Sequence, residues 1–223
     1  MLRSTTIFAK QPVAGQVKTR LSPPLSGADA ARLALAMLDD EVRTFASGDW
    51  RLGLAVAPAS ACAWFTQRYP AARVEAQVGD GLGERLATFF ERRTASEAST
   101  VVVGSDCPLL SVEALIEMHT RLSGPAECVF IPDQGGGYCA VGLTRAVPEL
   151  FTQVTMSTPT MFDETLRVAE RNGLRVEVLD ASNDVDDETG LERLREALRT
   201  EAAALRAPAT HALLRELETE LQR

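Results

Sequence analysis

The sequence predicts an α/β domain with a mostly parallel sheet and helices on both faces of that sheet. Three observations support this fold class: the chain has 223 residues, 45% of them are hydrophobic, and short apolar runs alternate with longer amphipathic segments. This length and apolar content suffice to build one core. Strands that alternate with helices are typical of parallel sheets, because parallel neighbours need a long crossover connection.

Seven apolar runs predict the strands, over residues 5–9, 52–57, 74–78, 100–103, 128–131, 139–143 and 174–179. The amphipathic stretches between and after them predict helices over residues 27–46, 60–69, 82–98, 112–123, 160–172 and 188–206. Ser26 and Ser111 are expected to cap helix N-termini, because a serine hydroxyl can accept a hydrogen bond from a free backbone N–H. Asn172 and Gly173 are expected to end the helix before the last strand.

The C-terminal segment predicts one more amphipathic helix, over residues 210–222, after a break at Pro208. Its leucines recur at helical spacing and form one apolar face. That face either packs on the body of the protein or contacts a second copy in a homodimer, and the sequence leaves both open. We therefore divide the chain into a domain at residues 1–206 and a helical extension at residues 207–223.

Composition and charge exclude several classes of protein. Apolar runs are too short for a membrane helix, and the N-terminal residues lack the pattern of a secretion signal. The net charge of −8 argues against binding to nucleic acid or to anionic membranes. The four cysteines show neither CxxC pairs nor zinc-site spacing, and therefore predict reduced thiols in the cytoplasm.

Five unusual loops follow predicted strands, and they predict one binding site. These loops span residues 10–20, 79–85, 105–108, 133–138 and 183–187. In an open parallel sheet, ligands bind beyond the carboxyl ends of the strands. We therefore expect the five loops to meet at one edge of the sheet.

The first loop predicts a phosphate-binding site. Arginine outnumbers lysine by 21 to 2, yet both lysines, Lys10 and Lys18, occur here together with Arg20. The ammonium group of lysine is a compact charge that can contact a phosphate oxygen as the phosphate moves. The glycine loop around Pro12 and Gly15 offers free backbone N–H groups that can bind further phosphate oxygens. The GxxxxGK[ST] pattern of a P-loop is absent. A solvated basic loop is the alternative interpretation.

The carboxylates of the later loops predict a magnesium site. Asp106 ends an apolar strand, where a carboxylate must be paired or bound to metal. Asp184 and Asp186 share one side of an extended segment and could supply further ligands. Mg²⁺ is typically held by one or two carboxylates together with substrate phosphates. The alternative is that these aspartates cap helices, although Ser111 is the better cap after Asp106.

Two glycine-containing loops could admit a ligand close to the backbone. Residues 135–137 are three glycines followed by Tyr138, which could stack on a ligand or donate a hydrogen bond to it. A tight hairpin turn is the alternative. Residues 79–81 precede a helix N-terminus, which attracts anions.

These motifs, in this order, resemble the DUF2064 proteins of bacteria, also named radical-SAM/selenodomain-associated glycosyltransferase-like transferases. The matching motifs are Lys-x-Pro-x-x-Gly-x-Val-Lys-Thr-Arg-Leu from Lys10, Gly-Asp-Gly-Leu-Gly-Glu-Arg from Gly79, Gly-Ser-Asp-Cys-Pro from Gly104, Gly-Gly-Tyr from Gly136 and Asp-Val-Asp from Asp184. The resemblance covers residues 5–195. The Lys-Thr-Arg-Leu segment, with residues 36–40, is also similar to phospholactate guanylyltransferases.

The resemblance implies a Rossmann-like three-layer α/β/α fold of the nucleotide-diphospho-sugar transferase (GT-A) superfamily. It implies a nucleotide bound by Lys10, Pro12, Gly15, Lys18, Thr19, Arg20, Gly79, Asp80 and Gly81, and an acceptor bound by Gly136, Gly137, Tyr138 and Ser157. It also implies Mg²⁺ or Mn²⁺ on Asp106, completed by Asp184 or Asp186, with Lys18, Arg20 and Asp106 as the catalytic residues.

Two departures from the family pattern concern the acceptor. The family has Asp-Gly-Gly-Tyr where this chain has Gly135 before Gly136, and it has Asp-Val-Asp-Thr-Pro where this chain has Asp187 and Glu188 after Asp186. The identity of the acceptor therefore stays open.

We expect nucleotidyl transfer from a nucleoside triphosphate to a phosphorylated small acceptor, with release of pyrophosphate. A triphosphate brings about four negative charges, which Lys10, Lys18, Arg20 and a divalent cation can largely offset. A glycosyltransferase that uses a nucleotide-sugar is the first alternative. A module that senses nucleotides without turnover is the second, although pure binding would not need Asp106 and both lysines.

Overall fold

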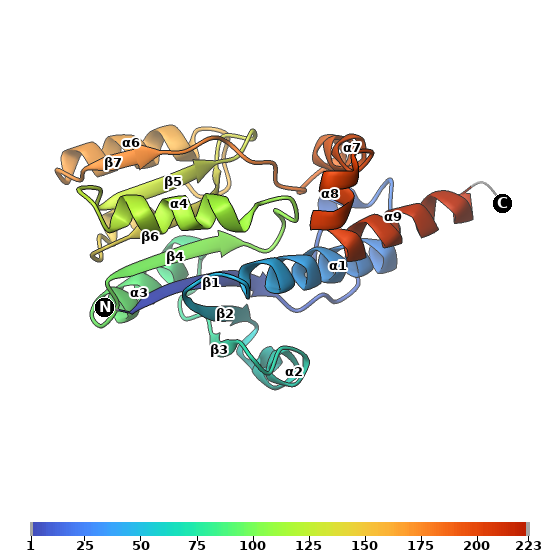
Figure 1. Cartoon of the computed structure of the whole chain (residues 1–223), viewed down its shortest axis with the longest axis horizontal. Helices are drawn as coiled ribbons and strands as arrows, with labels where there is room; N and C mark the ends of the chain where they lie inside the picture. Colours follow the sequence, from blue (N-terminus) through green and yellow to red (C-terminus); the bar gives the residue numbers. More distant parts are fainter. Residues whose placement is uncertain (1, 222–223) are drawn as a thin grey trace.

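The structure, a computed structural model, describes residues 2–221 and confirms the predicted α/β fold (Figure 1). Its seven strands form one sheet in the order β3-β2-β1-β4-β6-β5-β7. Within the described residues, β6 alone runs antiparallel to its neighbours. The strands are β1 (Arg3–Lys10), β2 (Arg51–Ala57), β3 (Arg73–Ala76), β4 (Ser99–Gly104), β5 (Cys128–Pro132), β6 (Tyr138–Leu143) and β7 (Val176–Val178).

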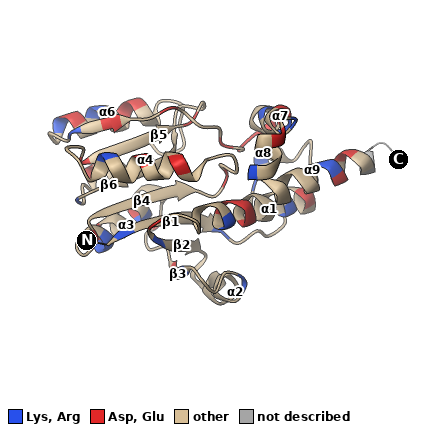
Figure 2. Ribbon diagram, viewed as in Figure 1, with Lys and Arg blue, Asp and Glu red and all other residues tan. Residues whose placement is uncertain are grey.

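Helices cover both faces of the sheet and complete the three layers (Figure 1). One core cluster joins the sheet to α1 (Gly27–Phe45), α2 (Cys62–Arg68) and α4 (Val112–Leu122). A second cluster, on the other face, joins it to α3 (Leu82–Thr94), α5 (Glu149–Thr152) and α6 (Met161–Arg171). The charged residues lie mostly on the helices (Figure 2). In residues 2–221 we find no helix with the length and apolar character that a membrane crossing requires.

Several predicted elements differ from the observed ones at their ends: α3 stops at Thr94, β7 is shorter than predicted, and α9 already begins at Pro208. Two helical segments differ more. The helix expected over residues 188–206 is two helices, α7 (Glu188–Ala197) and α8 (Glu201–Arg206), because Thr200 adopts an extended conformation and caps α8 by accepting a hydrogen bond from the Ala203 N–H. The short helix α5 has no sequence prediction. Ser26 and Ser111 do cap α1 and α4, as expected. Two short 3-10 helices, η1 (Thr19–Leu21) and η2 (Ala59–Ala61), complete the chain's secondary structure over residues 2–221.

The C-terminal helix α9 (Pro208–Leu221) packs on the body of the same chain, which is one of the two alternatives left open above. Its buried residues Leu213, Leu214 and Leu217 join a third core cluster with α1 and α7. The buried carboxylate of Asp40 on α1 accepts hydrogen bonds from the N–H groups of Ala209, at 3.1 Å, and Thr210, at 2.8 Å. Asp40 therefore ties the start of α9 to α1. The proposed domain boundary at residue 206 stays a prediction.

A buried histidine lies away from the predicted site and is held by the sheet. Its ring nitrogens are 3.0 Å from the Thr5 hydroxyl and 2.8 Å from the Ser99 hydroxyl, near the amino ends of β1 and β4. Burial, and then the positive charge of Arg3, lower the pKa of His119 to about 4. His119 is therefore a neutral, structural residue.

We predict that Asp40→Ala destabilises the protein by about 1–2 kcal/mol, because two N–H groups at the start of α9 lose their acceptor. Chemical denaturation measures this change as a lower free energy of unfolding. The matched control is Asp49→Ala, which removes an exposed carboxylate and should change stability by less than about 0.5 kcal/mol. Equal effects of the two substitutions would contradict the capping role of Asp40.

We also predict a pH dependence of stability that depends on His119. The folded state favours the neutral ring, so the free energy of unfolding should fall as the pH decreases from about 6.5 towards 4, by about 1.4 kcal/mol per pH unit from this group. The measurement is the difference between wild type and His119→Gln in denaturant titrations at several pH values. The prediction fails if both proteins lose stability equally over this range.

Candidate functional site

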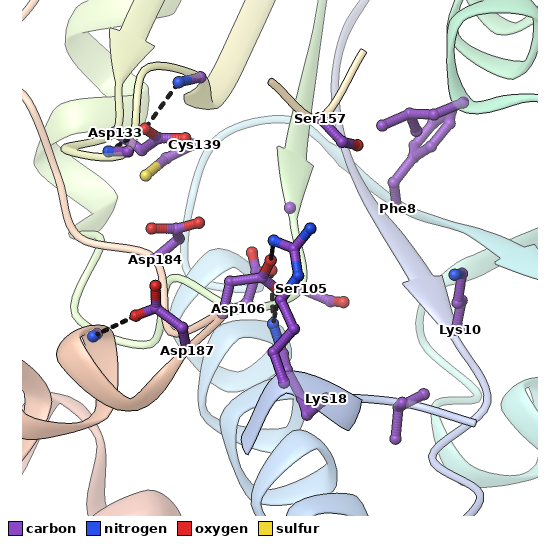
Figure 3. A pocket seen from close by; sticks show the side chains of 18 of the residues that line it. Phe8, Lys10, Lys18, Ser105, Asp106, Asp133, Cys139, Ser157, Asp184 and Asp187 are labelled. Atoms are coloured by element: carbon purple, nitrogen blue, oxygen red, sulfur yellow. Dashed lines mark hydrogen bonds and ion pairs between the residues drawn. The ribbon is translucent and has the colours of Figure 1, made fainter. Parts of the chain in front are cut away.

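The loops at the carboxyl edge of the sheet surround a cavity of about 1080 Å³ (Figure 3). Strands β1, β3, β4, β5 and β7 all end at this edge, and each of the five predicted loops contributes to the cavity wall. The predicted residues that line it are Lys10, Lys18, Thr19, Arg20, Asp80, Asp106, Gly137, Tyr138, Ser157, Asp184 and Asp186. The parallel sheet therefore brings together groups that lie up to 176 residues apart in the chain.

Five predicted residues do not line the cavity in the described part of the chain: Pro12, Gly15, Gly79, Gly81 and Gly136. Gly136 has a positive φ of 90°, and a side chain there would collide with the carbonyl oxygen of Pro159. Its role is to let the loop after β5 pack against the loop before α6. Glycine thus shapes this loop without facing the cavity.

Lys18 lies at the centre of the polar wall (Figure 3). Its Nζ is 2.8 Å from Asp106 Oδ2 and 3.3 Å from Asp186 Oδ1. The neighbouring Arg20 reaches the other oxygen of Asp186, with Nη1 3.0 Å from Oδ2. Lys18 has a left-handed backbone conformation, with φ of 49°, at the start of η1. This turn directs the first loop towards the ends of β4 and β7.

The charges of Lys18 and Asp106 stabilise each other. Burial by itself lowers the pKa of Lys18, but the charges of Asp106 and Asp186 outweigh burial and raise this pKa above its ordinary value. Burial likewise favours a higher pKa for Asp106, yet the Lys18 ammonium outweighs it and lowers the pKa of this carboxyl. Both groups are therefore charged at neutral pH.

Two neighbours fix the position of Asp106: Gly104 leaves space for its carboxylate, and Val185 binds its backbone carbonyl. At Gly104, a Cβ atom would lie 2.6 Å from Asp106 Oδ1, so glycine leaves the space that the carboxylate occupies. The Asp106 carbonyl accepts a hydrogen bond from the Val185 N–H at 2.9 Å. This bond connects the end of β4 directly to the segment that carries Asp184 and Asp186.

Two further carboxylates face the same wall. Burial, followed by the negative charges of Asp106 and Asp133, raises the pKa of Asp184 to about 6. Asp133 follows β5 and accepts hydrogen bonds through Oδ1 from the N–H groups of Gly135, at 2.6 Å, and Gly137, at 2.8 Å. Sequence reasoning did not include Asp133 among the site residues. Its position at the end of an apolar strand, like that of Asp106, was the available indication.

The residues present fit a divalent cation that is shared with a ligand. In residues 2–221, no group of three or more His, Cys, Asp or Glu side chains is arranged to hold a metal ion. Asp106 and Asp186, however, already contact one cationic group, the Lys18 ammonium, from two sides. Two carboxylates are what Mg²⁺ commonly uses when substrate phosphates supply the other ligands. The donor set therefore suits Mg²⁺ or Mn²⁺ in the presence of a phosphate-containing ligand.

The predicted acceptor residues take different positions around the cavity. The Tyr138 hydroxyl is buried and has no hydrogen-bond partner within the described residues, and the ring packs against Phe130 and Phe162. Tyr138 therefore contributes to the cavity wall, but its hydroxyl is buried and does not face the cavity. Ser157 lines the cavity with a positive φ of 62°, a conformation that is uncommon outside glycine (Figure 3).

Sequence reasoning missed several other polar residues of the wall. Arg85 donates from Nε to the Gly79 carbonyl at 2.9 Å, and Gln77 donates from Nε2 to the Ala55 carbonyl at 2.8 Å. Arg193, on α7, also lines the cavity. Arg193 lies within a helix pattern, where charged residues usually face solvent, so its sequence gives no distinguishing indication. Arg85 ends the predicted loop over residues 79–85 and the Gly-Asp-Gly-Leu-Gly-Glu-Arg motif, and that position was the available indication.

The buried carboxyl of Glu41 supports the turn that carries Asp106. Glu41, on α1, is 1% exposed and accepts a hydrogen bond through Oε1 from the Cys107 N–H at 2.7 Å. Its Oε2 is buried without a partner in the part of the chain that the structure describes. Burial, and then the negative charge of Asp106, raise the pKa of Glu41 well above its ordinary value. The neutral form of Glu41 is therefore favoured.

Comparison with known proteins identifies the fold and the family. The chain superposes on a protein from Desulfovibrio desulfuricans G20, provisionally named a nucleotide-diphospho-sugar transferase, with a TM-score of 0.90 and 26% identity over 98% of this chain and 96% of that chain. No curated protein matches the chain.

More distant solved structures share the fold. One is 4-diphosphocytidyl-2C-methyl-D-erythritol synthase from Anaerococcus prevotii DSM 20548, with a TM-score of 0.57 and 10% identity over 89% of this chain and 99% of that chain. Another is Rv0371c from Mycobacterium tuberculosis H37Rv in complex with manganese, with a TM-score of 0.53 and 17% identity over 88% of this chain and 100% of that chain.

These similarities class the chain as an enzyme of the nucleotide-diphospho-sugar transferase superfamily, as the sequence motifs predict. The family model described as "Uncharacterized protein conserved in bacteria (DUF2064)" matches residues 37–158, more than half of the chain. The protein therefore belongs to the DUF2064 family.

Proposed function

We propose that this protein catalyses nucleotidyl transfer from a nucleoside triphosphate to a phosphorylated small acceptor. In this reaction an acceptor phosphate oxygen forms a bond to the α-phosphorus, and the bond from that phosphorus to the pyrophosphate leaving group breaks. The observation that carries the proposal is the cluster of Lys18, Arg20, Asp106 and Asp186 at the carboxyl edge of the sheet. It combines cationic groups for a polyphosphate with carboxylates for a divalent cation.

The residues of the first loop would bind the triphosphate. Lys18 and Arg20 can contact its oxygens, and Lys10 lies across the cavity from Asp184, where it can assist the leaving pyrophosphate (Figure 3). Asp106, with Asp184 or Asp186, would hold Mg²⁺ or Mn²⁺, which when bound neutralises phosphate charge. Catalysis then depends on positioning and electrostatic stabilisation, without a protein nucleophile.

The size and wall of the cavity support binding of two ligands. Its volume of about 1080 Å³ exceeds the roughly 300–1,000 Å³ of common small-molecule sites, which leaves room for a nucleotide and an acceptor together. Gly137, Tyr138 and Ser157 form the part of the wall that we assign to the acceptor. The four free cysteines suit a reducing compartment, and we therefore place the reaction in the cytoplasm.

Glycosyl transfer from a nucleotide-sugar is the second candidate. It is favoured by the provisional name of the 26% identical structure. The same metal residues would serve, but the leaving group is a nucleoside diphosphate and needs fewer cations. Ligand-dependent thermal stabilisation with Mg²⁺ separates the two, since the ligand that binds raises the melting temperature according to its concentration and affinity.

We predict that Asp106→Asn lowers the rate of pyrophosphate release by on the order of 100-fold, because one charged ligand of the metal is lost. The assay combines each nucleoside triphosphate with Mg²⁺ and a panel of phosphorylated small molecules. Asp49→Asn is the matched control and should retain the wild-type rate, and melting temperatures show whether each variant folds. If nucleotide-sugars are consumed while no triphosphate pair releases pyrophosphate, the second candidate replaces the first.

We predict a graded response at Glu41. Glu41→Gln keeps an oxygen that can accept from the Cys107 N–H, and should stay within about threefold of the wild-type kcat/KM. Glu41→Leu leaves that N–H without a partner, and should lose about 1–3 kcal/mol of stability and a larger share of activity. Denaturation curves and steady-state kinetics test both variants. If Leu behaves like Gln, Glu41 does not position the Asp106 turn.

A further inference from the structure

We propose that the Lys18 ammonium occupies the cation position between Asp106 and Asp186 when no ligand is bound, so that a divalent cation binds well only after a polyphosphate has drawn Lys18 away. This inference rests on the proposed function for the ligands of the site. It goes beyond that function because it assigns an order and a coupling to their binding.

The carboxylate oxygens that a metal would need are already in use. Asp106 contacts Lys18 through Oδ2 at 2.8 Å, and its Oδ1 accepts from the Cys107 thiol at 3.7 Å. Asp186 contacts Lys18 through Oδ1 at 3.3 Å and Arg20 through Oδ2 at 3.0 Å. A divalent cation must therefore displace at least the ammonium group to reach both carboxylates.

Displacement is unfavourable while Lys18 has no other anionic partner. The Lys18 side chain is 9% exposed, so the ammonium group has little access to water. A divalent cation placed beside it would meet a positive charge at close range in a poorly hydrated site. The metal alone therefore competes against a pre-formed, largely buried ion pair.

A polyphosphate changes this balance, because its oxygens offer new partners to Lys18 and Arg20. Arg20 is 67% exposed, and its side chain can turn to an anion in the cavity without leaving a buried pocket. When both cationic groups move to the polyphosphate, Asp106 and Asp186 become available to the metal. Coupling of this kind is reciprocal, so the metal must in turn strengthen binding of the polyphosphate.

The experiment measures Mn²⁺ binding to the full-length protein by electron paramagnetic resonance, without nucleotide. Lys18→Met is expected to bind Mn²⁺ at least tenfold more tightly than wild type, because the competing ammonium is gone. Lys10→Met is the matched control: it removes the same charge from the same loop without touching either carboxylate, and should leave Mn²⁺ affinity within about twofold of wild type.

A double variant tests whether the tighter Mn²⁺ binding of Lys18→Met depends on Asp106. Lys18→Met combined with Asp106→Asn should lose the tighter binding, since the freed carboxylate is then missing. The proposal is overturned if Lys18→Met binds Mn²⁺ no more tightly than wild type, or if the gain persists in the double variant. Circular dichroism and melting temperatures establish that the variants are folded.

A measurement on the wild-type protein keeps the proposal testable if Lys18→Met does not fold. Acetylation by acetic anhydride, quantified for each lysine by mass spectrometry, reports how accessible the amines are. At constant ionic strength, Mn²⁺ at concentrations high enough to load the wild-type protein, as followed by electron paramagnetic resonance, should raise the acetylation rate of Lys18 several-fold and leave that of Lys10 unchanged. Lower Mn²⁺ concentrations should leave Lys18 protected, because the metal alone competes poorly with the ammonium group. Protection of Lys18 in the metal-loaded protein would refute displacement. Both assays omit nucleotide and turnover, so their outcome is independent of which transfer reaction the enzyme catalyses.

Discussion

The ion pair between Lys18 and Asp106 is the interaction on which the candidate site depends. It joins the loop after β1 to the end of β4, two strands that are neighbours at the centre of the sheet. A buried charge is tolerated only when it is paired, so each partner requires the other to stay in place. Asp186 and Arg20 extend the pair towards solvent. The site is therefore organised around charge compensation, and a ligand must provide equivalent compensation when it enters.

The topology of the sheet explains why the other groups reach the same place. Within the described residues, six parallel strands end at one edge, and the antiparallel strand β6 begins there, so the loop between β5 and β6 turns back over the cavity. Asp133 holds that turn through two backbone N–H groups. The segment after β7 then returns to the centre, where the Val185 N–H binds the Asp106 carbonyl. Segments that are distant in the sequence thus contribute adjacent side chains to the site through the loops at the ends of the strands.

Much of this architecture is predictable from the sequence, because it follows from periodicity and from the rule for parallel sheets. The seven apolar runs became seven strands, and the five loops predicted to form the site met at one edge. The pairing of Lys18 with Asp106 was not predictable, since it depends on the left-handed turn at Lys18. The direction of the Tyr138 hydroxyl depends on packing against Phe130. Glycines such as Gly79 shape a turn in this structure and do not face the cavity. The presence of a glycine in the sequence does not show whether it forms a turn or approaches a ligand.

The arrangement on α1 has a consequence for the far end of the chain. Asp40 and Glu41 are consecutive in α1, and they hold two different segments: Asp40 holds the start of α9, and Glu41 holds the turn that carries Asp106. Removal of α9 would expose Asp40 and the face of α1 that α9 covers. Any resulting rotation of that helix would be transmitted through a single peptide unit to the carboxylate at the centre of the site. The C-terminal helix and the turn at the centre of the site are thus held by neighbouring residues of α1, although they lie about 100 residues apart in the chain.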